Sequence, residues 1–590
     1  MHFIEEAHEA GTHFIVIDPV FNMTAARADK FIPINATTDA ALAMGLINEV
    51  VSNGWHDVEF LRDHTEAPLL VKEDGSLLKM SDFGVEPTEG DIDPATGKPS
   101  VVDPYVVWDE ETGDKSELAK AKNPAIEGVS EVEGIPVKTT FDYLMEIAAQ
   151  YPLEEVERIT GVSVADAKAL AEVYKKGNAV STYMQYGQDH YSNGHYACWA
   201  IFALGMVSGQ IGKPGAFAGV SCIAVIGLFN LAVSMAQDSN GQACQGLGRT
   251  FNLDRIGDIQ QTGICRDEPL VLKGLYVMGA NPISVYAEQR YVKDVFSKLE
   301  FIVVAEQSMT DTAKWADILL PAADWYEQTD MYAACGTHPY LLWNEKAIEP
   351  LYESKTDFEI YKLLLDKMGL GDFWGWESGE DALAEYLESD ALREMGISLD
   401  RLKEEKALRV VPGDVFLAYE GGAYLTPTQR GRFYQEAPFV DTEGYEVDLS
   451  KERAPHWELP FEADANCEVR ATYPFHCLSD HMRTRTHTQW WDVDLLDEVE
   501  TTPVVKMNPE DAAELDIVEG DKVKLFNDRG YVVLNAVVNA GLPRKTISVP
   551  RGFQQSEFID GHIASLPVMK FNQACANQPF NDVAVAIEKA

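Results

Sequence analysis

Two segments of the chain, 288 positions apart, repeat one pattern of residues. The first is FIVIDPVFNMTAARADKFIP at 14–33, and the second is IVVAEQSMTDTAKWADILLP at 302–321. In one register they share an acid, a Thr-Ala pair, an Ala-Asp pair and a proline, and Asp39 falls opposite Glu327 further on. Chance similarity of two ordinary β–α units is the alternative, but one register serving every match disfavours it. The repeat predicts two related folding units that bind two related ligands, or one ligand with two similar halves.

Each copy carries acids where a ligand is expected. A short apolar run, which we interpret as a buried parallel strand, ends at Asp18 in one copy and at Glu306 in the other. Doubly wound α/β sheets bind ligands beyond those strand ends, and an acid there commonly accepts from ribose hydroxyls. The second acid, Asp39 or Glu327, suits the paired N–H donors of a guanine edge. The pattern therefore favours two nucleotide-binding units.

The second copy is preceded by the rest of a βαβ unit. LYVMGANPISVYAEQRYVKDVFSKLE, at 275–300, has the pattern of a strand, a glycine-containing turn and a crossover helix. In the first copy, Met1 falls opposite Gln289, inside that helix. The partner strand and turn would lie before Met1, so we expect the first unit to be incomplete.

Composition and charge narrow the class of protein. The 590 residues suffice for about three domains. A net charge of −47 disfavours binding to a phosphate backbone, so no nucleic-acid partner is expected. None of the eight cysteines forms a C-x-x-C pair, which argues against an iron–sulfur or zinc site within the chain. The N-terminus lacks signal-peptide features, and the apolar stretch 215–237 is better explained as buried core than as a membrane span.

The same survey suggests domain boundaries. Residues 1–270 would hold the first α/β domain, N-terminally incomplete, with an irregular acidic surface insertion at 73–135. Residues 271–459 would hold the second, dinucleotide-binding α/β domain. In 460–590 short strands alternate with turn signals, which predicts a compact β-barrel domain.

Three local motifs have both an ordinary and a functional interpretation. His190 and His195 lie on one polar aromatic loop, but zinc would need a third ligand, so pocket or surface histidines are favoured. The G-x-x-G-x-x-G at 209–215 fits no dinucleotide fingerprint and is better explained as a packed turn. HMRTRTH, at 481–487, is either an exposed strand or a basic cluster for anionic groups such as a diphosphate.

Taken together, the motifs resemble the molybdopterin oxidoreductases of the dimethyl-sulfoxide-reductase family. The resemblance covers most of the chain and rests on IDPVFNMTAARAD, ITGVS, SGQIGKPG, MGANP, EQSMTDTAKWADILLPAADWYE, HMRTRTH and MNPEDAAELDIVEGDKVKLFNDRG. It implies an α/β fold with two related Rossmann-like parallel-sheet domains and a C-terminal β-barrel domain of the double-psi kind. It also implies one molybdenum or tungsten ion held by two molybdopterin guanine dinucleotides, at which a small molecule is oxidised or reduced.

The resemblance also assigns roles to residues. One guanosine end would be held by Asp18, Pro19, Thr37, Thr38 and Asp39. The other dinucleotide would be held by Gly279, Ala280, Asn281, Pro282, Glu306, Gln307 and Thr312. From the barrel, pterin or diphosphate groups would be contacted by Arg483, His487, Arg551 and Asn572. The loops GQDHYSNGHY and NGQACQGLG would lie near the metal and substrate, which makes His190 and Gln242 the candidate catalytic residues.

Departures from the family pattern set further expectations. The family's iron–sulfur motif and its metal-ligating Ser, Cys, selenocysteine or Asp are not found, so no residue of the chain is assigned to the metal. A 4Fe-4S cluster is expected only in a missing N-terminal part or a partner, and the expected partner is an iron–sulfur electron-transfer subunit. Thr37 stands where the family has glycine. Without a signal the chain as given would be cytoplasmic, but localisation stays open, because full-length relatives are often exported or membrane-associated. A non-redox hydratase and a non-catalytic remnant remain as alternatives.

Overall fold

The internal repeat is present in the computed structural model with the same strand register in both copies. β1 (Ile15–Asp18) pairs in parallel with β2 (Lys30–Pro33), and β15 (Phe301–Glu306) pairs in parallel with β16 (Ile318–Pro321). Ile15 lies opposite Lys30 and, 288 positions later, Val303 lies opposite Ile318. The sequence prediction of two related units is therefore reproduced residue for residue at their strands.

The Ala-Asp pair of the repeat has a structural role in both copies. The Phe14 amide donates to the Asp29 carboxylate at 2.7 Å, and the Ile302 amide donates to the Asp317 carboxylate at 2.8 Å. Each acid thus ties the start of one strand to the turn that precedes the next one. The alanine before it, Ala28 or Ala316, ends a short 3₁₀ turn in an extended conformation. The shared hydrogen bond explains why both segments carry an acid at this position.

The expected βαβ unit forms in the second copy. β14 (Gly274–Met278) pairs in parallel with β15, and α10 (Pro282–Val285) and α11 (Gln289–Ser297) make the crossover between them. In the first copy α1 (His2–Glu9) occupies the position that corresponds to α11. Among the described residues the parallel sheets have two strands in the first unit and three in the second. A full Rossmann-like arrangement remains a prediction for both.

A helical layer packs on the first unit. α2 (Asp39–Ser52) is buried along almost its whole length, and Gly45 allows close packing, since a Cβ there would lie 2.2 Å from Val156 Cγ2. α2 packs on α8 (Gly194–Val207) and on three shorter helices, which are α4 (Thr140–Ala148), α5 (Leu153–Thr160) and α6 (Val164–Val173). The expected break between the last two falls at Gly161, whose φ is 73°.

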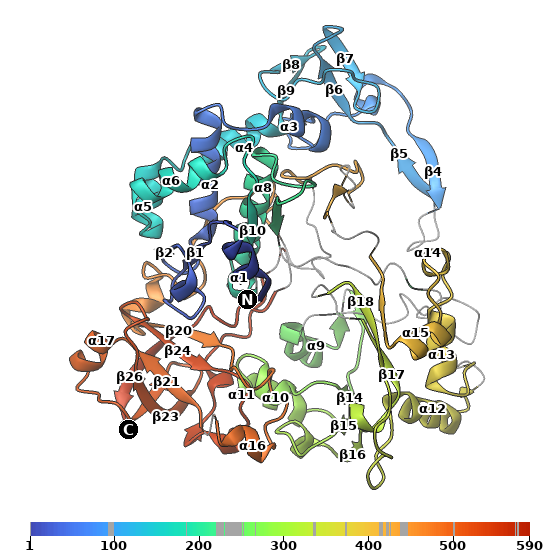
Figure 1. Cartoon of the computed structure of the whole chain (residues 1–590), viewed down its shortest axis with the longest axis vertical. Helices are drawn as coiled ribbons and strands as arrows, with labels where there is room; N and C mark the ends of the chain where they lie inside the picture. The colour runs from blue at the N-terminus through green and yellow to red at the C-terminus, as the bar shows by residue number, and fades with distance from the viewer. Residues whose placement is uncertain are drawn as a thin grey trace.

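The sequence predicts an irregular insertion at 73–135, but the described residues of this segment form regular strands. It forms antiparallel hairpins, and several of their apolar residues are buried, Leu78, Val106 and Val107 completely. Short strands joined by Asp- and Gly-rich turns hide such cores from composition arguments. The hairpins, at the top of Figure 1, are β4 (Thr88–Ile92) with β5 (Pro99–Val102), β6 (Val106–Asp109) with β7 (Asp114–Glu117), and β8 (Glu131–Val132) with β9 (Ile135–Thr139), which also pairs with β3 (Leu70–Lys72).

The predicted C-terminal β-barrel is confirmed as a closed barrel of six strands. Neighbours follow the order β21, β24, β20, β26, β22, β23, and parallel pairing of β23 with β21 closes the ring. Asn508 caps α17 (Pro509–Glu514) as its sequence predicts, by accepting from the Glu510 amide at 2.9 Å. The barrel strands are β20 (Phe475–Asp480), β21 (Val504–Met507), β22 (Lys522–Phe526), β23 (Tyr531–Val538), β24 (Thr546–Pro550) and β26 (Ala584–Lys589), and β25 (Asp560–Gly561) adds to β23.

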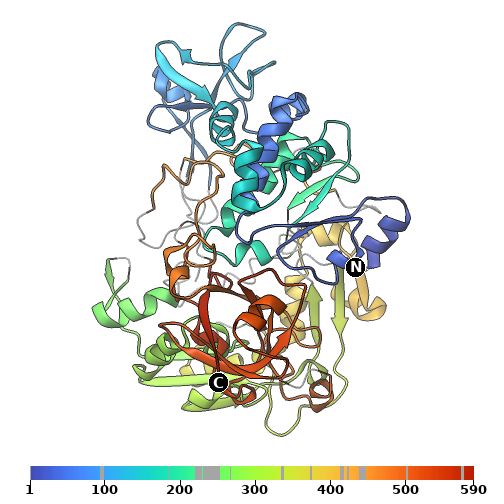
Figure 2. The same cartoon turned by 90° about the vertical axis from the view of Figure 1, so that its left-hand side faces the viewer.

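The barrel contacts both repeat units. It lies below the first unit and beside the second in Figure 1, and Figure 2 shows the same stack from the side. The Phe21 amide donates to Gly541 O at 2.9 Å, and Asn281 Nδ2 donates to Gln554 Oε1 at 3.2 Å. The barrel therefore bridges two segments that are far apart in the sequence.

The structure describes residues 2–92, 99–184, 186–219, 229, 251, 253–265, 267–333, 338–371, 375–411, 417–420, 424, 426–436, 447–499, 502–572, 574 and 577–590. Its other helices are α3 (Val58–His64), α7 (Tyr186–Asp189), α9 (Ile256–Thr262), α12 (Asp357–Met368), α13 (Gly379–Tyr386), α14 (Asp390–Glu394), α15 (Leu399–Glu405) and α16 (Asp494–Asp497). Its other strand pairings are β10 (Ser181–Tyr183) with β11 (Phe217–Gly219), β12 (Ile264–Cys265) with β13 (Glu268–Pro269), and β18 (Tyr340–Asn344) with both β17 (Asp330–Ala333) and β19 (Ala407–Arg409). None of the helices in these ranges is long and apolar enough to cross a bilayer. Most of the apolar stretch 215–237 lies outside the described residues.

Candidate functional site

A cleft of about 1060 Å³ opens at the carboxyl ends of β14, β15 and β16. This is where the strand order of an α/β sheet places ligands. Its floor is the turn after β14 and the residues that end β15. Six of the seven residues predicted for the second dinucleotide line it, namely Gly279, Ala280, Asn281, Pro282, Glu306 and Gln307.

Thr312, the seventh, lies behind the cleft wall instead. It is completely buried, its hydroxyl donates to Asn281 Oδ1 at 2.7 Å, and it accepts from the Ile283 amide at 3.0 Å. Thr312 therefore orients the turn that lines the cleft. A direct contact with a ligand is not open to its hydroxyl in this arrangement.

The facing wall comes from the C-terminal region. Residues 487–493 follow the basic HMRTRTH motif and place Trp490 and Trp491 in the cleft, with Trp325 across from the second unit. His487 and Trp490 have positive φ angles of 52° and 59°, a conformation uncommon for residues with side chains. Indole faces lining a cleft offer stacking surfaces for a planar base.

Acids dominate the lining of the cleft. Its ionisable lining is acidic except for His487, which also lines an adjoining pocket, and for two tyrosines. Burial raises the pKa of Glu306, opposed by a hydrogen bond from the Gln307 amide. The acidic side chains of the lining are Glu306, Asp324, Glu327, Glu353, Asp357 and Asp492. Carboxylates accept well from sugar hydroxyls and guanine N–H groups but repel phosphate.

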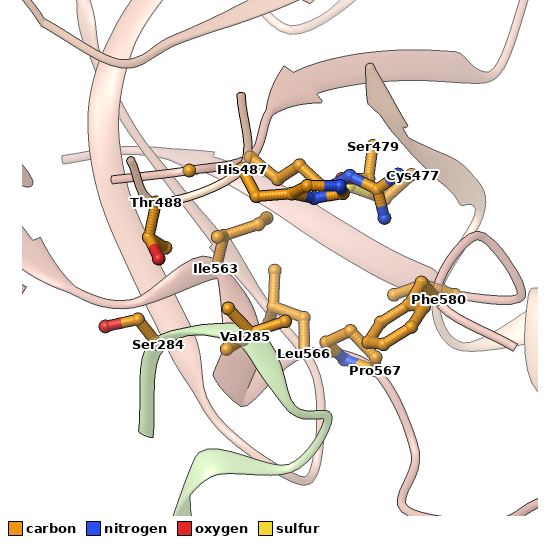
Figure 3. Close-up of a pocket in the computed structure, with 14 residues that line it drawn as sticks. Ser284, Val285, Cys477, Ser479, His487, Thr488, Ile563, Leu566, Pro567 and Phe580 are labelled. Atoms are coloured by element: carbon orange, nitrogen blue, oxygen red, sulfur yellow. The ribbon is translucent and has the colours of Figure 1, made fainter. Parts of the chain in front are cut away.

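A smaller pocket of about 50 Å³ adjoins the cleft and shares Val285, His487 and Thr488 with it. Figure 3 shows Ser284 and Val285 of the second unit on one side and Cys477, Ser479 and His487 of the C-terminal region on the other. Burial raises the pKa of Cys477 to about 12, so its thiol stays protonated. The pocket is thus shaped jointly by the two parts of the chain.

Arg551 and His487 line this pocket, and His481 lies beside them. Arg551 Nη2 lies 2.7 Å from His481 Nε2, and the His481 and His487 rings meet edge to face at 5.4 Å. Burial lowers the pKa of both histidines, and the charge of Arg551 lowers it further. Arg551 Nε is buried without a hydrogen-bond partner. A buried guanidinium N–H left unpaired, with neutral imidazoles beside it, fits an anionic group supplied by a ligand.

The cleft and the adjoining pocket together fit a dinucleotide. Hydroxyl and guanine donors match the carboxylates of the cleft, planar bases match the indoles, and a diphosphate or pterin acceptor matches Arg551 and its unpaired Nε in the pocket. The residues present therefore suit a group with a nucleoside at one end and anionic or acceptor atoms at the other.

The corresponding acids of the first unit lie close together. Asp18 accepts from the Val20 amide at 2.7 Å and from Asn22 Nδ2 at 3.1 Å, and burial raises its pKa. Burial raises the pKa of Asp39 to about 6, and the charge of Asp18 contributes, while Gln188 donates to the Asp39 carboxylate. Two carboxylates held this way are disposed to accept from a ligand with several donors.

The flanking residues of this predicted site are mostly structural. Thr37 is buried at a φ of 74°, and its Oγ1 has no hydrogen-bond partner. Its carbonyl accepts from Asn193 Nδ2 and Trp457 Nε1, both at 3.0 Å. Thr38 bonds its hydroxyl to Asn35 O at 2.7 Å and caps no helix with its side chain. Pro19 lies half-buried directly after β1.

The loop 186–195 brings an acid and a histidine to the barrel. Burial lowers the pKa of His190 to about 4, and the charges of Arg551, His481 and His487 lower it further. Next to it, burial raises the pKa of Asp189 to about 6, and its buried Oδ1 has no hydrogen-bond partner. His190 is therefore neutral near pH 7, and Asp189 is the group that changes charge. Gln242, the other catalytic candidate, lies outside the described residues.

Asn572 and Arg483, two further residues predicted to contact the cofactor, lie in different surroundings. Asn572 Nδ2 donates to Ser192 O and lies 3.4 Å from His195 Nδ1, so this side chain supports the 186–195 loop. Arg483 is exposed and lines neither pocket. Its neighbour Arg485 is the buried arginine, at 2.6 Å from Glu557 and over the Phe553 ring.

Both carboxylate oxygens of Glu327 accept hydrogen bonds from the protein. Oε1 accepts from the Leu351 amide at 2.9 Å, and Oε2 accepts from the Asp324 amide and the Ser354 hydroxyl at 3.0 and 3.3 Å. It lines the cleft, but its acceptor capacity is largely used.

The sequence analysis does not identify Gln554, because this residue belongs to no motif. Among the described residues, no group of three or more His, Cys, Asp and Glu side chains is arranged to hold a metal.

Comparison with known families agrees with this geometry. Residues 1–367 match the family of molybdopterin oxidoreductases, and residues 475–584 match the molybdopterin dinucleotide-binding domain. The chain belongs to the molybdopterin oxidoreductase family. Its cofactor is accordingly a molybdopterin guanine dinucleotide with molybdenum, as the resemblance had implied.

Individual relatives span nearly the whole chain. The putative catalytic subunit of a dimethyl sulfoxide reductase from Halobacterium salinarum is 28% identical over 100% of this chain and 67% of its own length. The alpha subunit of dimethylsulfide dehydrogenase from Rhodovulum sulfidophilum is 24% identical over 94% of this chain and 68% of its own. The chain thus spans about two thirds of the length of these relatives. Acetylene hydratase from Pelobacter acetylenicus has the same fold, with a TM-score of 0.71 at 16% identity over 100% of this chain and 75% of that one.

Proposed function

We propose that the chain forms the catalytic part of an oxidoreductase that oxidises or reduces a small molecule at a molybdenum centre held by two guanine dinucleotides. The observation that carries the proposal is the repeat itself. It places Asp18 and Glu306, in one strand register, at the ends of two parallel strands, and a large cleft opens at the second of them. When bound, the cofactor supplies a metal that changes oxidation state.

In this proposal the chain's own residues bind, orient and exclude water. One nucleoside is enclosed by the cleft-lining residues between Gly279 and Gln307 and by the indoles of residues 490–491. The other nucleoside is held by Asp18 and Asp39. Arg551 and the neutral His481 and His487 donate to the anionic middle of the ligand. Asp189 holds a proton beside Arg551 and can give it up near pH 6. These roles need no metal ligand from the described residues.

The cofactor assignment can be tested without turnover. Protein purified from a host that makes the cofactor is denatured, and the released nucleotide and metal are measured. We expect guanine nucleotide and molybdenum, at two nucleotides per metal. Release of adenine nucleotides alone would contradict the pairing of acids with guanine.

Partners and electron flow belong to the same proposal. Several relatives carry subunit names, such as the alpha subunits of perchlorate reductase from Dechloromonas aromatica and of dimethylsulfide dehydrogenase. An iron–sulfur protein that exchanges electrons with the site is therefore the proposed partner. Co-purification with a tagged chain should recover a protein whose visible spectrum shows iron–sulfur absorbance.

A non-redox hydratase is the second candidate, because a hydratase shares the fold. The two functions differ in whether electrons leave the protein. A dye-linked assay with reduced viologen and sulfoxide, N-oxide or chlorate substrates should show oxidation of the dye. Hydration of an alkyne with no dye reaction would instead favour the hydratase.

A further inference from the structure

The barrel meets the second unit through a buried polar cluster behind the two pockets. Its centre is Gln554, in the segment after β24, whose side chain is completely buried. Figure 3 shows the edge of this interface, where Ser284 and Val285 face the C-terminal residues. Buried polar groups in proteins are usually hydrogen-bonded, so each polar group of this cluster is examined for its partners.

One oxygen of Gln554 accepts two hydrogen bonds from the second unit. Asn281 Nδ2 donates to Gln554 Oε1 at 3.2 Å, and the Asp311 amide donates to it at 2.9 Å. Ser284 Oγ also lies 3.2 Å from Oε1, but its single hydrogen is directed to the nearer Asp311 Oδ2, at 2.8 Å. The Gln555 amide returns a bond to Asp311 Oδ2 at 2.6 Å. Two neighbouring barrel residues thus hold two separate turns of the second unit, the one after β14 and the one after β15.

The orientation of both amides is fixed by backbone donors. The Thr312 amide donates to Asn281 at 3.2 Å, so the atom facing it is Oδ1 and the other is Nδ2. The Asp311 amide donates to Gln554, so the atom facing it is Oε1. A flipped amide would put donors against donors in either case. Gln554 is therefore an acceptor here, and its Nε2 is buried without a partner.

Asn281 connects this cluster to the nucleotide cleft. Asn281 lines the cleft, and its side chain accepts from Thr312 and donates to Gln554. The far wall of the same cleft belongs to residues 487–493. The distance between the two walls thus depends on how the barrel sits on the second unit.

We propose that Gln554 is a positioning residue that fixes the Asn281 turn to the barrel, so that nucleotide binding and barrel docking are one coupled event. The proposal rests on the proposed function, since it takes the cleft to hold a guanine nucleotide. Coupling is reciprocal: if docking favours the nucleotide, a bound nucleotide must favour docking by the same factor.

The exchange of the Asp311 amide with solvent deuterium reports docking directly, because its acceptor is Gln554. In the unaltered full chain, free of cofactor, saturating GDP is expected to slow exchange of the peptide containing Asp311 and Thr312. Gln554→Met keeps the length and removes the acceptor. We expect roughly tenfold faster exchange of that peptide without nucleotide and about tenfold weaker GDP binding by calorimetry.

Gln555→Ala is the matched control. It deletes a neighbouring side chain that bonds Gly561 O within the barrel and leaves the backbone bond to Asp311. It should change neither exchange at Asp311 nor GDP affinity. Unaltered exchange and affinity in Gln554→Met would overturn the inference while leaving the proposed function intact.

Two further outcomes separate the claims. If the unaltered chain does not bind GDP, the proposed function is contradicted. The exchange rate of the Asp311 amide in Gln554→Met would then still test whether Gln554 docks the barrel. If Gln554→Met does not fold, the unaltered chain still decides the coupling, because GDP that binds without slowing exchange at Asp311 overturns it.

Discussion

Asp39, a proposed ligand contact of the first unit, lowers the stability of the fold that carries it. Its carboxylate lies half-buried beside Asp18, and burial raises its pKa from 3.8 to about 6. A carboxyl whose pKa is raised on folding costs no stability below pH 4 and costs increasingly as pH rises through 6. A ligand that donates hydrogen bonds to this carboxylate recovers that cost only when it is bound.

The first prediction is therefore a gain of stability. In cofactor-free protein, Asp39→Asn should raise the free energy of unfolding at pH 8, by at most roughly 3 kcal/mol for a shift of this size. The gain should vanish below pH 4, where both side chains are neutral. Urea unfolding at the two pH values measures it. Asp29→Asn should act in the opposite direction, because the Phe14 amide and His8 lower the pKa of Asp29.

The second prediction concerns nucleotide retention. Asp39→Ala removes an acceptor from the proposed ligand site, while Asp29→Ala removes only the tie to Phe14. Loss of a charge-assisted contact costs roughly 1.5–3 kcal/mol, so retention should fall about tenfold or more in the first variant. Guanine released per mole of purified protein gives the comparison. Equal retention would contradict the role of Asp39.

The third prediction separates Asp189 from His190. With a pKa of about 4, His190 does not change charge near neutrality, while Asp189 titrates near pH 6. The dye-linked rate should therefore show an inflection near pH 6 that persists in His190→Gln and disappears in Asp189→Asn. An inflection lost with His190 and kept without Asp189 would reverse the assignment.

At the scale of elements, the glycine at position 552 allows the loop 481–493 to pack closely against the barrel. Gly552 has a φ of +107°, and a Cβ there would lie 1.9 Å from His487 O. The close approach brings His487 to the pocket and the indoles to the cleft. A side chain at 552 would push the loop outward without touching the barrel core.

Gly552→Ala should therefore lower nucleotide retention severalfold while the barrel stays folded. Gly520→Ala is its control, because Gly520 has a similar φ of +85° but no atom within 4 Å of its added Cβ. Both variants bear the same backbone strain of roughly 1 kcal/mol, and only the first moves the loop. Circular dichroism and released guanine measure the two effects. Equal retention in both would mean that the loop position does not matter for binding.

Local patterns explain which elements could be predicted. The two strand pairs, the crossover of the second unit and the Asn508 cap all follow from short-range periodicity and capping residues. The 73–135 hairpins were missed because their cores close over long distances, as when the Leu77 amide bonds Glu436. HMRTRTH could not show which arginine turns inward, since the partners of Arg485 lie about 70 positions away. Gln554 belongs to no motif, and only the docked barrel brings it to its donors, Asn281 and the Asp311 amide.

For the whole molecule, charge is the dominant property. With 95 acids against 48 lysines and arginines, the folded chain carries −47 and repels itself. Dissolved salt screens such repulsion, with a Debye length of about 3 Å at 1 M. Salt also weakens individual ion pairs, but most of those here are exposed and contribute little.

The midpoint of thermal unfolding should therefore rise steadily with potassium chloride between about 0.1 and 2 M. Sucrose at matched osmolality is the control, because it does not screen charge. A midpoint that stays level or falls with salt would show that self-repulsion does not limit the stability of this protein.

The charges of the cleft and its adjoining pocket have one more consequence. A dinucleotide that approaches the proposed site meets the field of these charges before it makes any contact, because Arg551 attracts its phosphates while Glu306 and Asp357 repel them. Entry the wrong way round would bring phosphate oxygens against carboxylates at once. In the proposed function, the charges therefore favour one of the two possible orientations of the ligand before it binds.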